Sequence, residues 1–476
     1  MNRRHLLRSS TFAGTYSLLS PLAHAAGVNG ELRVVVIGVK GRGASHINAV
    51  LSHQKARLVG LCDIDSDQLD RKVAELSKRS KLSGLKTYSD YRKVCEDPDV
   101  DAVCIATCNH THAVIALTAA AAGKHAYTEK PISHNVWEGQ KLADGQAKYG
   151  TVIAHGFQRR SETSWAEAFE WLKAGNIGKL TLARGFCYKP RKSIGKVDSP
   201  VKAPKTVDYD LWSGPREILP IRRSQFHYDW HWQSPYGNGD LGNQGPHQLD
   251  VCRWALGDPM HLPPAIISIG GRYGYIDDGD TANTQILYVD HKPAPILFEV
   301  RGLPKKGLDW KNGMPDYKGV TIGNVIEYEG GSLLGGHNSG CKIVDKEGKT
   351  LKEFKGGKDH IHNFIDACHS GKQDPMHGAE NGHHSSALAH IGAHALRLGQ
   401  ELPADQIKAS LTKTPAVAEA FDRMMEHFEA NGIGATRPGL GAPLTTDGKS
   451  FTGEFAAAAN QLDREHYRAG HTLPNA

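Results

Sequence analysis

The sequence predicts an α/β protein, with a doubly wound parallel sheet over residues 30–155 and an α+β domain with a mostly antiparallel open sheet over residues 156–400. Two observations predict this class. Short β-branched runs alternate with helical segments up to residue 155, as parallel βαβ units require. Beyond residue 156 the chain is richer in Pro, Gly and Trp, and amphipathic strands follow one another, which favours antiparallel pairing.

The first domain starts with a strand over residues 31–38, built from Leu, Val and Ile and ending in glycine. A helix over 44–54 and a strand over 56–63 complete one βαβ unit. The alternation continues with helices predicted over 67–81, 89–96, 111–122 and 137–149 and strands over 86–88, 100–106, 125–129 and 152–156.

The second domain opens with a helix over 163–174, whose apolar residues recur at helical spacing. Strands are predicted over 180–188, 265–273, 283–289, 296–301 and 319–328, and helical structure returns over 360–398. Residues 401–476 are expected to form one helix over 416–430 and then an extended tail rich in Gly, Pro and Thr.

Residues 1–26 have the pattern of a twin-arginine export signal. Arg3 and Arg4 precede a short apolar stretch over 11–22, and Ala23 and Ala25 supply small residues for cleavage. An ordinary secretory signal is the alternative. The stretch is too short to span a bilayer, which needs about 20 apolar residues. We therefore expect a periplasmic or secreted protein, with no membrane attachment after cleavage.

The charge pattern argues against a nucleic-acid partner, because the formal net charge is only +6 and no run of five Lys or Arg occurs. The eight cysteines include no C-x-x-C pair, so we expect free buried thiols. His383, His390 and His394 could share a helix face, but no Cys or acidic residue lies at ligand spacing between them. No metal site is predicted.

A glycine turn between the first strand and the first helix predicts dinucleotide binding. Gly38, Gly41 and Gly43 would let backbone N–H groups approach a pyrophosphate at a helix N-terminus. Asp63 ends the second strand, where a carboxylate accepts hydrogen bonds from ribose hydroxyls and repels a 2′-phosphate. NAD is therefore expected rather than NADP. Lys40 stands where the usual fingerprint has another glycine.

Four motifs then carry a family resemblance. In order, they are Gly38-Val39-Lys40-Gly41-Arg42-Gly43, Thr107-Cys108-Asn109-His110-Thr111-His112, Glu129-Lys130-Pro131 and Gly156-Phe157-Gln158-Arg159-Arg160. Together they resemble the superfamily of glucose-fructose oxidoreductase, inositol dehydrogenase and MocA (Gfo/Idh/MocA), over about residues 30–400. Cys108 replaces the usual proline. The resemblance implies a Rossmann NAD-binding domain.

The resemblance further implies that Asn109 and His112 line the cofactor trough, and that Glu129 and Lys130 lie beside the nicotinamide. A lysine at the end of a parallel strand also lies where such sheets bind ligands. The full set of residues expected to bind the cofactor is Gly38, Lys40, Gly41, Arg42, Gly43, Asp63, Thr107, Asn109, His112, Glu129, Lys130 and Gln158.

Residues 227–250 are the richest in candidates for substrate binding. Aromatic rings stand there among amide, imidazole and carboxylate groups, a mixture that suits sugar rings and their hydroxyls, although buried packing is the alternative for each ring. The residues expected to bind substrate are Lys130, Arg159, Tyr188, His227, Trp230, Trp232, Asn243 and His247.

Residues 243–250 fall on the family pattern D-x-G-x-H-x-x-D, with Asn243 in place of the first aspartate. The resemblance implies a catalytic cluster of Lys130, Asn243 and His247. An amide cannot carry a proton, so Asn243 can only orient its neighbours. His247 is the expected general base, since an unperturbed imidazole titrates near neutrality. Lys130 would hold the hydroxyl, or act as the base if its pKa is lowered.

The expected function is NAD-dependent oxidation of a sugar, glycoside or polyol, with tightly bound cofactor, or hydride exchange between two sugars. A redox-neutral NAD-dependent glycosidase or lyase is the first alternative. A ligand-binding protein without catalysis is the second, suggested by Lys40 and Asn243. The substrate would be the partner, and a homo-oligomer is expected.

Overall fold

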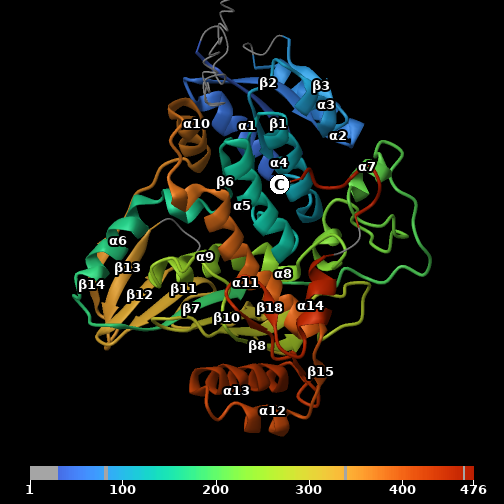
Figure 1. Ribbon diagram of the computed structural model, residues 1–476. Helices are drawn as coiled ribbons and strands as arrows, with labels where there is room; N and C mark the ends of the chain where they lie inside the picture. The colour runs from blue at the N-terminus through green and yellow to red at the C-terminus, as the bar shows by residue number, and fades with distance from the viewer. Residues whose placement is uncertain (1–29, 80–83, 337–339, 465–466, 476) are drawn as a thin grey trace, which may run out of the picture.

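The computed structural model describes residues 30–79, 84–336, 340–464 and 467–475. The export signal predicted over residues 1–26 lies outside them. Two domains are stacked, with the N-terminal domain at the top of Figure 1 and a large sheet crossing beneath it. No helix in the described part combines the length and apolarity needed to cross a membrane.

The N-terminal domain is a six-stranded parallel sheet in the order β3-β2-β1-β4-β5-β6. Its strands are β1 (Leu32–Ile37), β2 (Ala56–Cys62), β3 (Lys86–Tyr88), β4 (Ala102–Ile105), β5 (His125–Thr128) and β6 (Ile153–His155). Its helices are α1 (Arg42–Ser52), α2 (Ser66–Ser77), α3 (Tyr91–Glu96), α4 (His112–Ala121) and α5 (Val136–Tyr149). The strand order reverses between β1 and β4, which opens a crevice at their carboxyl ends.

A helix from late in the chain completes this first core. Helix α10 (His360–Ser370) packs against α1, and its residues Ile361, Phe364 and Ile365 join the cluster formed by β1, α1 and β2. The two helices lie side by side at the top of Figure 1. The apolar outer face of the N-terminal sheet is therefore covered partly by a segment that follows most of the second domain.

The second domain is built on a ten-stranded sheet in the order β14-β13-β12-β11-β7-β10-β9-β8-β16-β15. Among the described strands of this sheet, only β7 and β10 pair in parallel. The strands are β7 (Leu180–Tyr188), β8 (Ile266–Gly271), β9 (Thr284–Val289), β10 (Ile296–Arg301), β11 (Ile322–Tyr328), β12 (Gly331–Gly335), β13 (Cys341–Asp345), β14 (Thr350–Phe354), β15 (Gln400–Glu401) and β16 (Gly439–Leu440).

Helices cover both faces of this sheet. The face toward the first domain carries α8 (Gly239–Asn243), α9 (Gly245–Ala255) and α11 (Ala379–Arg397), with α6 (Thr163–Lys173) at one end. The opposite face is covered by α12 (Ala404–Ser410) and α13 (Pro415–Ala430), which lie below the sheet in Figure 1. Helix α14 (Ala456–Asp463) follows a small hairpin of β17 (Thr445–Thr446) and β18 (Phe451–Thr452).

The C-terminal segment is more structured than the sequence predicted. One helix was expected after residue 401, whereas the structure has α12, α13 and α14. Strands β12, β13 and β14 were also missed, because their short runs mix glycine, lysine and apolar residues without a clear alternation. The free thiols were predicted correctly: all eight cysteines are unpaired, and only Cys108 is not fully buried.

Candidate functional site

The glycine turn after β1 forms a cradle that side chains would fill. Gly38 has φ of +84°, and a Cβ there would lie 2.6 Å from the carbonyl oxygen of Ala106. A Cβ on Gly43 would overlap the carbonyl oxygen of Gly38. Helix α1 begins at Gly41 with no side-chain cap and no acidic residue in its first turn. The free N–H groups therefore suit an anion such as a pyrophosphate, and Lys40 lies exposed in the turn.

The carboxylate of Asp63 lies at the adjoining end of β2. One oxygen accepts a hydrogen bond from the N–H of Val39 at 3.0 Å and the other from the N–H of Asp65 at 3.0 Å. Burial raises the pKa of Asp63, and these two backbone donors oppose that effect. Asp63 is thus held beside the glycine turn, as a ribose-binding acid requires.

The crevice holds a pocket of about 410 Å³, which joins the glycine turn, Asp63, the loop after β4 and the end of β5. Thr107, Asn109 and His112 all line it, as predicted. The two ring nitrogens of His112 lie 2.7 Å from the carbonyl oxygen of Pro131 and 3.1 Å from that of Thr107. His112 therefore links the loop after β4 to the loop after β5, and both loops line the pocket.

Glu129 lies at the centre of a charged network at the end of β5. Its Oε1 accepts from Arg42 at 3.1 Å, contacts His46 Nε2 at 3.0 Å and accepts from Gln158 at 3.3 Å. Although burial alone raises the pKa of Glu129, His46, Arg42 and Lys130 together bring it well below its usual value. Glu129 is a charged residue that fixes Arg42 and Gln158 around the pocket.

Lys130 and Asn243 meet across the two domains. The Lys130 ammonium donates to the backbone carbonyl of Asn243 and, at 3.2 Å, to its side-chain oxygen. The pKa of Lys130 is lowered to about 8, chiefly by burial and also by the charges of Lys189 and Arg42, against the opposing charge of Glu129. The lysine is therefore held only by neutral oxygens and loses its proton more readily than a surface lysine.

His247 lies in the first turn of α9, close to Lys130. Burial holds its pKa well below the usual value, and the charge of Lys130 adds to the effect. The imidazole is therefore neutral at pH 7.

Asp250, the last residue of the family pattern, does not face Lys130. Its side chain is fully buried and binds Arg160 through two hydrogen bonds of 2.8 Å. It also accepts a hydrogen bond from Ser385.

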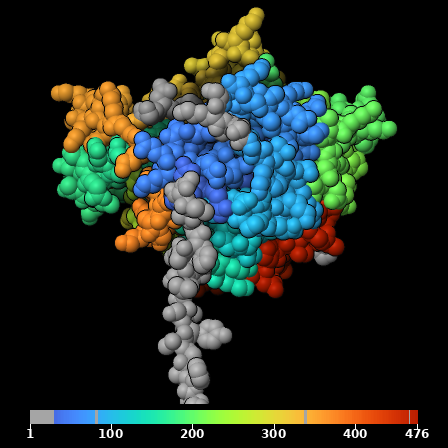
Figure 2. Space-filling view, turned by 90° about the horizontal axis from the view of Figure 1, so that it is seen from above, coloured from blue at the N-terminus to red at the C-terminus, as the bar shows by residue number. Residues whose placement is uncertain are grey.

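A long segment of the second domain, residues 189–238, closes over the end of the pocket beside Asp63. His227 Nε2 lies 2.8 Å from a carboxylate oxygen of Asp65, and the N–H of Asp208 donates to Ile64. Trp212 and Trp230 of this segment line the pocket with His227. Seen from above, this green segment lies directly against the blue N-terminal domain (Figure 2).

The two tryptophans predicted to bind substrate divide between the pocket and the packing around it. Trp230 lines the pocket, stacked on His231 with ring centroids 3.7 Å apart. Trp232 is not among the pocket-lining residues; it packs over Arg191, with the guanidinium 5.1 Å from the ring centroid. The half-exposed Tyr228, one of the aromatic residues in the stretch expected to bind sugar, also lines the pocket, as does His231, which sequence reasoning missed.

Tyr188 does not face the pocket. Its hydroxyl donates to the buried Glu299 at 2.8 Å and accepts from Arg423 of α13 at 3.1 Å, on the far face of the sheet. Side chains alternate along a strand, so the neighbouring Cys187 and Lys189 face Lys130, whose pKa both affect. The prediction for Tyr188 was wrong by one residue, and Lys189 was missed.

The guanidinium of Arg159 is bound by other groups of the protein. Its guanidinium donates to both carboxylate oxygens of Glu162, at 2.8 and 2.6 Å, and to the carbonyl of Gly336. Its charge still lowers the pKa of His247. The histidines of α11 are buried among protein groups, and in the described residues no three His, Cys, Asp or Glu are arranged to hold a metal ion.

Comparison with known proteins agrees with this geometry. Residues 32–157 match the family described as "Oxidoreductase family, NAD-binding Rossmann fold". The myo-inositol 2-dehydrogenase of Thermotoga maritima is 30% identical over 183 residues, which are 38% of this chain and 49% of that protein. The levoglucosan dehydrogenase of Pseudarthrobacter phenanthrenivorans is 30% identical over 187 residues, 39% of this chain and 40% of its own length. The chain thus spans about half or less of the length of these two curated relatives.

A solved structure resembles both domains. Levoglucosan dehydrogenase in complex with NADH superposes with a TM-score of 0.56 at 19% identity, covering 76% of this chain and 96% of that one. The likeness shows a shared fold. It confirms the predicted α/β class, a parallel Rossmann sheet followed by a mostly antiparallel one.

Proposed function

Since residues 32–157 match the oxidoreductase family with an NAD-binding Rossmann fold, we propose that the protein is an NAD-dependent oxidoreductase acting on a hydroxyl of a sugar, glycoside or polyol. One observation carries the proposal. Lys130, with a lowered pKa, lies in the same pocket as the glycine turn and Asp63. This arrangement supports Lys130 as the proton acceptor beside the nicotinamide of a bound NAD.

The proton path is assigned to Lys130. Bound NAD would supply the acceptor for the hydride of the carbinol carbon, and the residues of the glycine turn with Asp63 would hold it. The hydroxyl proton passes to the neutral amine of Lys130, whose pKa near 8 suits a base at neutral pH. Asn243 then stabilises the new ammonium through its two oxygens. His247, expected from the sequence to be the base, is instead proposed to hydrogen-bond the hydroxyl, because its lowered pKa makes it a weak base.

Retention of the cofactor is part of the proposal. The segment over residues 189–238 closes on the ribose end of the pocket through Asp65, His227 and Asp208. If residues 1–26 direct export, the enzyme works outside the cytoplasmic NAD pool and must carry its cofactor with it. The contacts of residues 189–238 support cofactor retention, which an exported enzyme would need, because these contacts must open before NAD is released.

Denaturing the purified protein and assaying the released nucleotide tests the cofactor. We expect NAD(H), and Asp63→Ala should bind it at least tenfold more weakly through loss of the ribose contacts. A matched control, Asp67→Ala, alters an exposed acid on α2. A protein that releases only NADP(H), or whose Asp63→Ala variant binds NAD normally, contradicts this assignment.

A sugar screen that follows nicotinamide absorbance tests the reaction. The oxidoreductase should form a keto product with NADH and need an added acceptor for further turnover. The redox-neutral glycosidase differs, since it returns the hydride and releases aglycone without an acceptor. Incubation with nitrophenyl glycosides in heavy water separates them: aglycone release with deuterium beside the oxidised carbon would establish the glycosidase instead.

A further inference from the structure

The closing segment over residues 189–238 places one more imidazole in the pocket that contains Lys130. Its one-turn helix η4 (Asp229–Trp232) carries His231, which lines this pocket. The proton path proposed above gives His231 no function. Because His231 belongs to the second domain and Lys130 to the first, a substrate that lies between the domains would contact both side chains.

A hydrogen bond fixes which ring nitrogen of His231 carries the proton. Its Nδ1 lies 2.5 Å from the backbone carbonyl oxygen of Tyr228. A carbonyl oxygen only accepts, so Nδ1 donates, and in the neutral ring Nε2 is then a bare acceptor. The pKa of His231 is lowered to about 3, chiefly by burial and also by the charges of Lys130 and Arg191, although the hydrogen bond to Tyr228 opposes this. The ring therefore stays neutral near pH 7, and Nε2 accepts a hydrogen bond but cannot donate one.

The free nitrogen of His231 is open to the pocket. Within the described part of the chain Nε2 makes no hydrogen bond, and it is not one of the fully buried nitrogens that lack a partner. The side chain is only partly buried. By contrast, the unpaired Nδ1 atoms of His390 and His394 in α11 have almost no accessible surface, so no ligand reaches them. Nε2 of His231 is therefore an acceptor that a molecule in the pocket can contact.

Stacking holds the ring of His231 in one orientation. It lies nearly parallel to the indole of Trp230, with ring centroids 3.7 Å apart and an angle of 20° between the planes. The indole Nε1 donates to the carbonyl of His227 at 3.1 Å, and His227 in turn contacts Asp65 beside the cofactor end of the pocket. The acceptor is thus oriented before a ligand binds, which lowers the entropic cost of binding.

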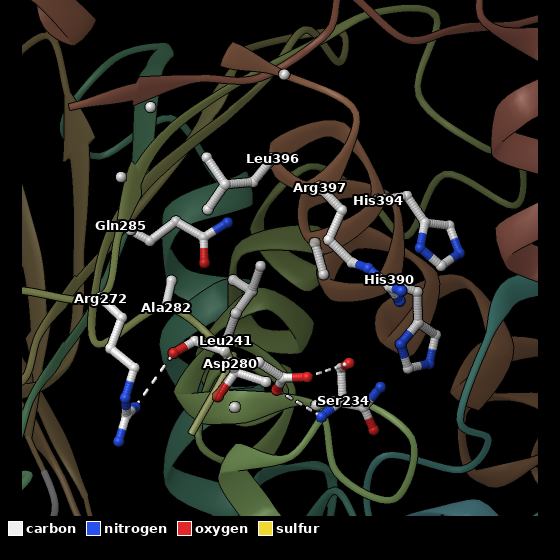
Figure 3. Close-up of a pocket in the computed structure, with 18 of the residues that line it drawn as sticks. Ser234, Leu241, Arg272, Asp280, Ala282, Gln285, His390, His394, Leu396 and Arg397 are labelled. Carbon is white, nitrogen blue, oxygen red and sulfur yellow. Dashed lines mark hydrogen bonds between the residues drawn. The ribbon is translucent and has the colours of Figure 1, made fainter. Parts of the chain in front are cut away.

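The chain that follows η4 is anchored to the loop between β8 and β9. Ser234 donates from its backbone N–H and from its hydroxyl to the carboxylate of Asp280, at 2.7 Å each, as the dashed lines in Figure 3 show. The N–H groups of Asp280 and Thr281 donate in return to the carbonyl of Trp232. These bonds fix η4 to the second domain, so His231 keeps its place in the wall of the pocket.

A hydroxyl is the group that fits both sides of the pocket. Nε2 of His231 needs a donor, whereas the ammonium of Lys130 needs an acceptor, and a hydroxyl can be either. A carboxylate or an ether oxygen has lone pairs only, which Nε2 would repel. The half-exposed Tyr228 adds an aromatic face to the same pocket, and such a face suits the C–H groups of a sugar or cyclitol ring.

We propose that His231 is a substrate-binding residue that accepts a hydrogen bond from a second hydroxyl of the substrate, other than the one oxidised beside Lys130. The inference rests on the proposed function and narrows its substrate class to diols and polyols whose second hydroxyl reaches Nε2. An analogue that lacks this hydroxyl, or has an ether or a carboxylate in its place, binds more weakly, because a site built to pair with a hydroxyl rejects molecules that leave it unpaired.

Saturation-transfer NMR and calorimetry with D-glucose and myo-inositol test the proposal, on protein in saturating NADH so that no oxidation takes place. The wild type should bind at least one probe, and His231→Leu should raise the Kd of that probe about tenfold, as expected for loss of one hydrogen bond. His231→Gln, whose amide oxygen also accepts, should recover part of the loss. The control His261→Leu alters an exposed histidine outside the pocket and should leave the Kd unchanged. Circular dichroism verifies that each variant is folded.

Monodeoxy derivatives of the probe that binds identify the hydroxyl. In the wild type one derivative should bind about tenfold more weakly than the parent molecule. In His231→Leu the same derivative and the parent should bind equally well, because the partner of that hydroxyl is already absent. A purely structural effect of His231 would instead weaken the parent and the derivative by the same factor.

The proposal is overturned if neither probe binds the wild type, if His231→Leu leaves the Kd unchanged, or if each deoxy derivative loses the same factor in that variant as in the wild type. Binding in NADH needs no hydride transfer, so the result is independent of turnover. If the wild type forms no NADH from NAD with any polyol while one hydroxyl still pairs with His231, the proposed oxidation fails and the contact stands.

Discussion

Lys130 donates hydrogen bonds to two oxygens of the same residue, the backbone carbonyl and the side-chain amide of Asn243. Lys130 belongs to the Rossmann domain and Asn243 ends α8 of the second domain, so this contact joins the domains at the site itself. An amide adds no charge, so the lysine keeps a pKa of about 8. An aspartate at this position would attract its proton more strongly.

The first prediction concerns pH. If Lys130 is the base, kcat/KM for oxidation should rise with pH up to about 8 and then level, because only the neutral amine accepts a proton. Asn243→Asp should raise the Lys130 pKa and move this rise to higher pH, because a higher pKa leaves less neutral amine at neutral pH. Asn243→Ala, which adds no charge, is the control. An identical profile in the Asp variant would show that Lys130 is not the base.

Lys189 should also affect the pH dependence of kcat/KM, through its charge rather than through a hydrogen bond to Lys130. Its charge lowers the pKa of Lys130, so Lys189→Gln should raise that pKa and shift the rise of kcat/KM to higher pH. The exposed Lys192, three residues along the same segment, supplies the control Lys192→Gln, which should not move it. Equal effects from both variants would contradict a specific interaction with Lys130.

Gly43→Ala should abolish tight NAD binding. The added Cβ would overlap the carbonyl of Gly38, which forces the turn away from the pyrophosphate position. Gly336→Ala is a matched control, since a Cβ there meets nothing within 4 Å. Fluorescence titration with NADH measures both. Normal affinity in Gly43→Ala would mean that the turn does not bind the phosphates.

His227→Ala should speed the release of NAD(H) by about tenfold, as expected for loss of roughly 1.4 kcal/mol from one charge-assisted contact that holds the closing segment. The contact removed is the 2.8 Å pair with Asp65. Stopped-flow displacement by excess nucleotide gives the rate, and Lys202→Ala, exposed on the same segment, is the control. If release is unchanged, the segment does not retain the cofactor.

Asp250→Asn should destabilise the protein by about 2 kcal/mol or more, because the buried guanidinium of Arg160 loses one of its two charged partners and keeps only Asp258. Asp250 and Arg160 are 0% and 1% exposed. Urea unfolding measures the loss, with the surface pair variant Glu170→Gln expected within about 0.5 kcal/mol of wild type. A small effect at Asp250 would place it in function rather than in folding.

Local patterns predicted the cofactor side of the site. The glycine turn, Asp63 and Lys130 each follow a buried parallel strand, and the ends of such strands meet at one edge. The positions of these residues depend only on short-range structure, so four sequence motifs were sufficient to predict that they lie together. The family match over residues 32–157 confirms the resemblance drawn from them.

The substrate side depends on contacts that motifs do not encode. The end of β7 decides whether Tyr188 or Lys189 faces Lys130, and one residue of register exchanges the two faces. Tyr188 belongs to the ion network of Glu299 and Arg423, which forms only because α13 packs beneath the sheet. No local pattern around residue 188 reveals a helix more than two hundred residues later.

Helix α10 determines when, during synthesis, the core of the N-terminal domain can be completed. Its residues Ile361, Phe364 and Ile365 fill the core of the N-terminal domain, and the ribosome produces them roughly 200 residues after β6. Until then only α1 and α2 contribute helical residues to this core, so the nascent Rossmann domain stays incompletely packed while most of the second domain is made. A truncated chain ending near residue 160 would expose this core and aggregate. The first core is thus complete only when a segment made after most of the second domain has packed against it.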